Sequence, residues 1–119
     1  MGYSCNARCS YVMDSISNWI YEKGNTGSSN TWKTPKGTFF YERGRENKDG
    51  AITGTVFKMT DEGMHCKAVG SYKIDPNGKI VRFAHIPKEV KKDAEKYGEK
   101  KYKEFHSRPL VTFIGTNLS

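Results

Sequence analysis

The chain has 119 residues, an apolar fraction of 35% and a formal net charge of +7, which is enough chain to bury the core of one domain. It contains no apolar stretch long enough to cross a bilayer, and no basic start followed by an apolar run of the secretory type. We therefore expect one domain over residues 1–119, located in the cytoplasm, and exclude the membrane-spanning and exported classes.

The first predicted element is an amphipathic helix over residues 6–23. Its apolar residues recur at spacings of three and four, which is typical of a helix with one buried face; they are Cys9, Val12, Met13, Ile16, Trp19 and Ile20. Gly24 follows as a typical helix stop, and the small polar residues 24–30 predict a loop.

Four runs rich in aromatic and β-branched residues predict strands at about 37–43, 51–60, 65–74 and 79–86. Residues 44–50 are interpreted as a hairpin loop, and the "DPNG" stretch at 75–78 fits a type I turn that pairs Asp75 with Lys79. Strict alternation from that turn places Ile74 opposite Ile80 and Tyr72 opposite Arg82. It also predicts a core face that holds Cys66, Ala68, Gly70, Tyr72 and Ile74, and a wetter face that holds His65, Lys67, Val69, Ser71, Lys73, Val81, Phe83 and His85.

A second helix is predicted over residues 88–106, after Pro87. Its apolar stripe contains Val90, Ala94, Tyr97, Tyr102 and Phe105. Gly98 lies within that stripe and predicts either a close packing contact or a break, and we expect one helix.

The order of these elements predicts an α+β domain, with a four-stranded antiparallel meander between an N-terminal and a C-terminal helix. The apolar tail at 110–119 is a candidate fifth strand at the sheet edge. Two other placements stay open for the tail, which are pairing with a second copy in a homodimer and packing over the core.

Three cysteines, Cys5, Cys9 and Cys66, are an odd number in a chain without export features, which favours reduced thiols over disulfides. Cys5 and Cys9 share one helical face, and zinc binds thiolates together with an imidazole such as that of His65. His65 and Cys66 are neighbours on a strand and point to opposite faces, so both bind one ion only at a bulge or a strand end. We expect the three thiols to be core residues, with no metal or cofactor, and keep zinc ligation as the alternative.

The histidines His65, His85 and His106 fall on two predicted strands and a helix, and no sequence motif frames any of them as a catalytic base. No glycine-rich phosphate loop ends in Gly-Lys-Ser or Gly-Lys-Thr. We therefore expect no catalytic residues, and a binding module rather than an enzyme.

Aromatic side chains alternate with lysine and arginine across the predicted sheet, a combination typical of surfaces that bind single-stranded nucleic acid. The net positive charge lies in residues 31–108 and favours acidic partners. Our leading hypothesis is a small basic module that contacts nucleic acid non-specifically through the sheet and the adjoining loop. The candidate contact residues are Arg43, Arg45, Lys67, Lys73, Arg82 and Phe83. The alternative is a protein-binding accessory factor, such as a viral or regulatory inhibitor, that recognises an acidic partner surface.

Overall fold

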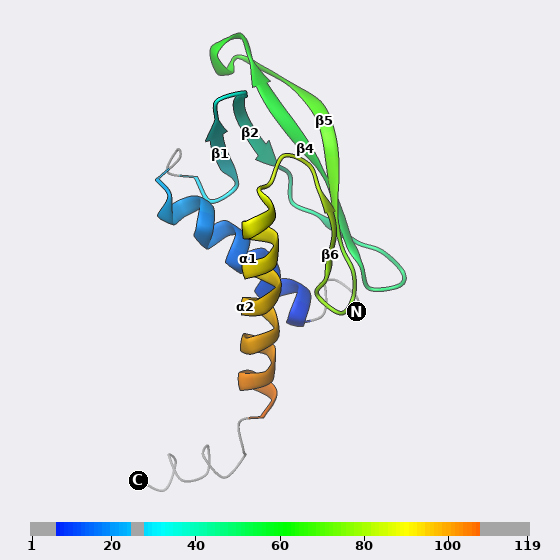
Figure 1. Cartoon of the computed structure of the whole chain (residues 1–119). Helices are drawn as coiled ribbons and strands as arrows, with labels where there is room; N and C mark the ends of the chain where they lie inside the picture. Colours follow the sequence, from blue (N-terminus) through cyan, green and yellow to red (C-terminus); the bar gives the residue numbers. More distant parts are fainter. Residues whose placement is uncertain (1–6, 25–27, 108–119) are drawn as a thin grey trace, which may run out of the picture.

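The computed structural model describes residues 7–24 and 28–107, and shows an N-terminal helix, an antiparallel sheet and a C-terminal helix (Figure 1). The predicted α+β class is confirmed. The helices are α1 (Ala7–Glu22) and α2 (Lys88–His106). The strands are β1 (Thr31–Thr34), β2 (Gly37–Tyr41), β3 (Arg45–Glu46), β4 (Ile52–Thr60), β5 (His65–Ile74) and β6 (Ile80–Phe83), with a short 3-10 turn, η1 (Asp61–Gly63), between β4 and β5.

All the strands belong to one sheet, in the order β1-β2-β4-β5-β6, with β3 paired to the start of β4. The expected count of four strands is wrong because β1 and β3 are additional. Both are short, four and two residues long, and Pro35 directly after β1 is a residue that breaks strands. The predicted strand at 37–43 is therefore the second in the sheet, and it ends at Tyr41.

The turn between β5 and β6 is confirmed. The Asp75 amide donates to the Lys79 carbonyl at 2.9 Å, and Gly78 has a φ of +85°, the left-handed conformation that the turn requires. The Asp75 carboxylate accepts from the amide of Lys79, also at 2.9 Å. Ile74 pairs with Ile80, as predicted.

A β-bulge at Val81 then changes the register between these two strands. Arg82 pairs with Lys73 rather than with Tyr72, so Val81 is an extra residue on β6. An extra residue reverses the alternation of side chains beyond it. Tyr72 consequently pairs with Phe83, which is only 8% exposed. The predicted pairing of Tyr72 with Arg82 and the predicted position of Phe83 on the wetter face are both wrong.

A second bulge lies at Val69 on β5. Two consecutive residues of β4 pair with Gly70 and Ala68, so Val69 is extra and the alternation reverses again. As a result, Ala68 and Cys66 move to the face opposite the core, and Lys67 moves to the core side. Cys66 is exposed, so the prediction that it is a core thiol is wrong.

We call the face of the sheet that carries buried Phe39, Val56 and Tyr72 the inner face, and the opposite face the outer face. Both helices lie on the inner side (Figure 1). The side chains that α1 buries against the sheet are those of the predicted stripe, Cys9, Val12, Ile16 and Ile20, with Met13 and Trp19 partly buried. No element of the described chain covers the outer face.

Aromatic rings fill the centre of the core. Trp32 packs against Phe39, Tyr41 and Phe83 with ring centroids 6.0–6.2 Å apart, and Tyr72 stacks on Phe83 at 4.8 Å. The Trp32 indole N–H donates to the His85 carbonyl at 3.1 Å, which satisfies its polar atom inside the core.

Helix α2 packs on α1 through Gly98. A Cβ atom at this position would lie 2.5 Å from Cγ2 of Val12, so the glycine permits a close helix contact and α2 continues through it. Tyr97, directly before this crossing, is 38% exposed, and Phe105, near the end of the helix, is 57% exposed. The predicted buried stripe of α2 is therefore correct only for its first half.

None of the described helices has the length and apolar character needed to span a bilayer. Two predictions, on Cys5 and on the tail at 110–119, lie outside the described residues.

Candidate functional site

Three of the predicted contact residues form one row on the outer face. Arg45 pairs with Thr53, Thr53 with Lys73, and Lys73 with Arg82, so the row crosses four strands. Adjacent strands are about 4.8 Å apart, which puts Lys73 about 5 Å from Arg82 and about 10 Å from Arg45 along the backbone. We call Arg45, Lys73 and Arg82 the cation row.

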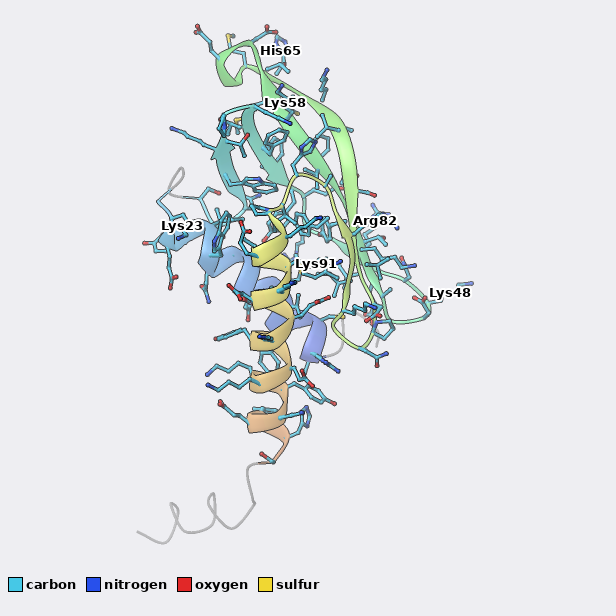
Figure 2. The ribbon with its side chains drawn as sticks, in the orientation of Figure 1. Lys23, Lys48, Lys58, His65, Arg82 and Lys91 are labelled. Carbon is cyan, nitrogen blue, oxygen red and sulfur yellow. The ribbon has the colours of Figure 1, made fainter. Side chains whose placement is uncertain are left out.

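Arg82 is exposed, and its Nε donates to the hydroxyl of Ser71 at 2.7 Å. Figure 2 shows Arg82 on the side of the sheet away from the helix that carries Lys91. The hydrogen bond directs the Arg82 guanidinium along the outer face and leaves its remaining donors available to a partner.

A pair of stacked rings shares the outer face with the cation row. Phe40 and Phe57 are cross-strand partners with ring centroids 5.1 Å apart and planes 19° apart, and both are half-buried. Phe57 is four residues from Thr53 along β4, or about 13 Å. The outer face therefore combines aromatic surface with cations a little more than 10 Å away.

The acidic residues near the cation row are engaged by backbone amides. Asp49 accepts from the amide of Ala51 at 3.0 Å, and Asp75 accepts from the amide of Asn77 at 2.9 Å. Glu42 accepts from Thr55 at 3.0 Å. These carboxylates stabilise turns and a strand junction, and they do not form ion pairs with the cation row.

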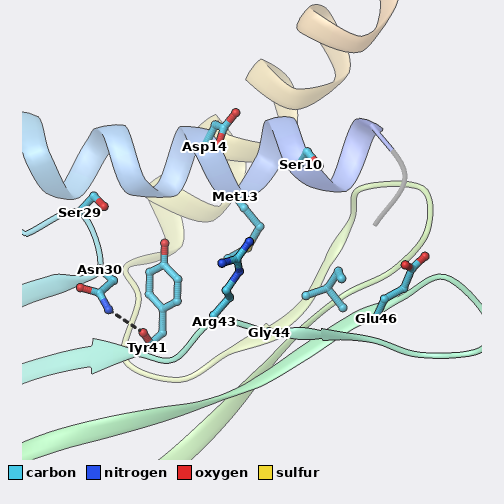
Figure 3. Close-up of a pocket in the computed structure, with 10 residues that line it drawn as sticks. Ser10, Met13, Asp14, Ser29, Asn30, Tyr41, Arg43, Gly44 and Glu46 are labelled. Carbon is cyan, nitrogen blue, oxygen red and sulfur yellow. Dashed lines mark hydrogen bonds between the residues drawn. The ribbon is translucent and has the colours of Figure 1, made fainter. Parts of the chain in front are cut away.

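The other predicted contact residues lie elsewhere. Lys67 pairs with Lys58 on the inner side, toward the η1 end of the sheet, and Phe83 is in the core. Arg43 extends toward α1 into a pocket on the inner side (Figure 3). The structure thus brings together half of the predicted set and separates the rest.

The pocket lies between α1 and the end of the sheet where β3 meets β4, and has a volume of about 490 Å³. Its lining residues are Ser10, Met13, Asp14, Ser29, Asn30, Tyr41, Arg43, Gly44, Glu46 and Ile52. The Tyr41 hydroxyl is 2.6 Å from that of Ser17, and the Asn30 amide donates to the Tyr41 carbonyl at 3.0 Å (Figure 3).

Burial raises the pKa values of two titratable groups that line this pocket. It raises the pKa of the Asp14 carboxyl above the usual value. It also raises the pKa of the Tyr41 phenol; the hydrogen bond with Ser17 opposes that rise, and the nearby Asp14 charge adds to it. Asp14 and Glu46 were not predicted from the sequence as site residues. The one signal for Asp14 is its position after Met13, at the margin of the apolar stripe of α1.

The two cysteines that the structure describes, Cys9 and Cys66, lie far apart. Cys9 is buried, and its thiol is 2.8 Å from the Asp75 carbonyl at the end of β5. Cys66 lies near the opposite end of that strand, about 26 Å away at 3.3 Å per residue. The described residues contain no group of three His, Cys, Asp or Glu side chains close enough to hold an ion.

The histidines lie in three separate parts of the chain. His65 pairs with Asp61 at 2.9 Å beside η1. The ring of His85, after β6, stacks on Phe39 with centroids 4.3 Å apart, and His106 is the last residue of α2.

No protein-family model, curated protein or solved structure matches the chain.

Proposed function

We propose that the outer face binds single-stranded nucleic acid without sequence preference. The single observation that carries this proposal is the cation row, three cross-strand neighbours on a sheet face that no described element covers. Cations at this spacing pair with phosphate groups, and the uncovered face gives an extended strand room to lie across the sheet.

The Phe40 and Phe57 pair supports a single strand over a duplex. Bases can stack on aromatic side chains only when they are not already stacked within a helix. The ring pair, on β2 and β4, shares the outer face with Arg82, which lies two strands away on β6. One strand can thus contact rings with its bases and cations with its phosphates.

The test is fluorescence anisotropy of nuclease-treated protein with labelled oligonucleotides of about 12 nucleotides, single-stranded and duplex, at several salt concentrations. We expect tighter binding to the single strand and a steep salt dependence. Arg45→Gln and Arg82→Gln should each weaken binding and reduce the slope of log K against log salt by about 0.7.

Lys67→Gln is the matched control, because it removes the same charge from the inner side. Its net charge equals that of the outer-face variants, so a general loss of charge affects all three variants alike. Equal weakening by all three variants would contradict a site on the outer face. No binding to either oligonucleotide at low salt would favour the alternative, an acidic protein surface steered by the same cations.

A further inference from the structure

The pocket under α1 contains a cation and a carboxylate that face no partner. Arg43 and Glu46 both project from the sheet side toward α1 (Figure 3). Neither forms an ion pair with a described residue. We propose that this pocket binds a small molecule with a carboxylate at one end and an ammonium group at the other, joined by a short aliphatic chain. The site is on the opposite side of the sheet from the proposed nucleic-acid surface and does not depend on it.

Arg43 defines the carboxylate end. Its side chain extends across the pocket and ends beside Met13 of α1 (Figure 3). A guanidinium presents two parallel N–H donors that match the two oxygens of a carboxylate. Arg43 is exposed, so its guanidinium is open to a molecule that enters the pocket from solvent.

Glu46 defines the ammonium end. One of its carboxylate oxygens, Oε1, is buried and has no hydrogen-bond partner in the described chain. Buried polar atoms are nearly always paired, because an unpaired one loses its water without compensation. An ammonium group has three donors and a charge opposite to that of Glu46.

The middle of the pocket is apolar. Met13 and Ile52 line it, and Ile52 is the cross-strand partner of Glu46. Arg43 and Glu46 are three residues apart, so their Cα atoms are separated by at most about 10 Å. A spacer of about five methylene groups between the charged ends is on this scale, and it would contact the two apolar side chains.

The charge balance of the lining also selects the ligand. Asp14 and Glu46 outnumber the single cation, Arg43. A dianion such as a phosphate monoester would be repelled by this lining, whereas a zwitterion adds no net charge. The volume of about 490 Å³ is within the range of small-molecule sites.

The test is isothermal titration calorimetry of the full chain with 6-aminohexanoate and with two analogues that each carry one of its charged groups. These analogues are hexanoate, which has only the carboxylate, and 1-aminohexane, which has only the ammonium group. We expect 6-aminohexanoate to bind at least about tenfold more tightly than either analogue, because it alone makes both charged contacts. Arg43→Gln should reduce its affinity to that of 1-aminohexane, and Glu46→Gln to that of hexanoate. Arg45→Gln, on the outer face, should leave its affinity unchanged.

Three results would overturn the proposal: equal affinity for the three compounds, no binding of 6-aminohexanoate at millimolar concentration, or the same loss of affinity with Arg45→Gln.

A second measurement uses the unaltered chain, so it does not depend on whether a variant folds. In amide NMR spectra of the unaltered chain, 6-aminohexanoate should shift the signals of Met13, Asn30 and Gly44 and leave those of Thr53 and Ser71 in place. Shifts confined to the outer face would refute the site.

Discussion

Arg43 and Arg45 are two residues apart in the chain but lie on opposite faces of the sheet: Arg43 lines the pocket under α1, and Arg45 pairs with Thr53 on the outer face. Residues two apart on a regular strand would share a face. The junction between β2 and β3 therefore breaks the alternation, and each arginine belongs to a different candidate site.

The register shows where this break arises. Between the pairs Tyr41 with Val56 and Glu46 with Ile52, the chain advances five residues on one side and four on the other. Tyr72 lies beneath this junction, where its hydroxyl donates to a backbone carbonyl, that of Glu42, at 2.8 Å. This contact holds the extra residue in place.

Tyr72→Phe should lower the free energy of unfolding by about 1 kcal/mol, because the hydrogen bond to the carbonyl of Glu42 is lost while the ring remains. Urea unfolding measures the change. Tyr97→Phe, on the exposed side of α2, is the control and should have no effect. An unchanged midpoint for Tyr72→Phe would show that its hydroxyl does not hold the junction.

The different exposure of Cys9 and Cys66 makes a prediction about thiol reactivity. In a Cys5→Ser background, Cys66 should react at once with a thiol reagent, because it is exposed on the outer face. Cys9 is fully buried and should react only when denaturant is added. Two slow thiols would contradict the exposure of Cys66 at this end of β5, where His65 to Ala68 are exposed on both faces of the sheet.

Composition and periodicity predict most of the elements here. The bounds 88–106 match α2, and the turn at 75–78 fixes the pair Ile74 with Ile80. They do not predict the extra residues at Val69 and Val81, because a bulge depends on contacts across the sheet rather than on local preference. Each extra residue reverses the faces beyond it, so Phe83, chosen as a contact residue, is in the core.

The candidate site also depends on contacts across the sheet that the local sequence does not show. Arg45, Lys73 and Arg82 meet in one row only because of the bulge at Val81 and the break before β3. The pocket forms only where α1 meets the sheet, and nothing in the sequence near Asp14 or Glu46 shows that both line one pocket. The spacing of apolar residues shows which face of a helix is buried, but it does not show which residues pack against that face.

Gly98→Ala should destabilise the chain although alanine is the better helix former. In an exposed helix the change stabilises by about 1 kcal/mol, but here the new Cβ would lie 2.5 Å from Cγ2 of Val12 and 3.2 Å from its backbone nitrogen. We expect a loss of about 1–3 kcal/mol. A double-mutant cycle with Val12→Ala should recover part of that loss, and stabilisation by Gly98→Ala would contradict the close crossing of α1 and α2.

Tyr41 should make stability fall at high pH. Burial raises the pKa of its phenol in the folded chain, so the folded state holds a proton that the unfolded state releases above about pH 10. The stabilisation is complete below pH 10 and is lost as the pH rises through the higher folded pKa. Tyr41→Phe lacks this dependence.

At pH 7 Tyr41→Phe should be less stable than the unaltered chain by about 1 kcal/mol, because the hydrogen bond with Ser17 is lost. The difference between the two unfolding free energies should narrow as the pH is raised above 10. Tyr21→Phe, at an exposed position of α1, is the control for general alkaline effects. A constant difference from pH 7 to pH 11 would contradict the raised pKa.

Phe57→Leu tests whether the stacked rings contribute to binding. Leucine keeps the apolar contact with the sheet but removes the flat surface on which a base can stack, so the affinity for a single-stranded oligonucleotide should fall about tenfold or more. The slope of log K against log salt should not change, since no phosphate contact is lost. Phe105→Leu, on the exposed half of α2, is the matched control and should bind normally. If Phe57→Leu changes neither quantity while Arg82→Gln weakens binding, the outer face contacts phosphates alone and the rings are structural.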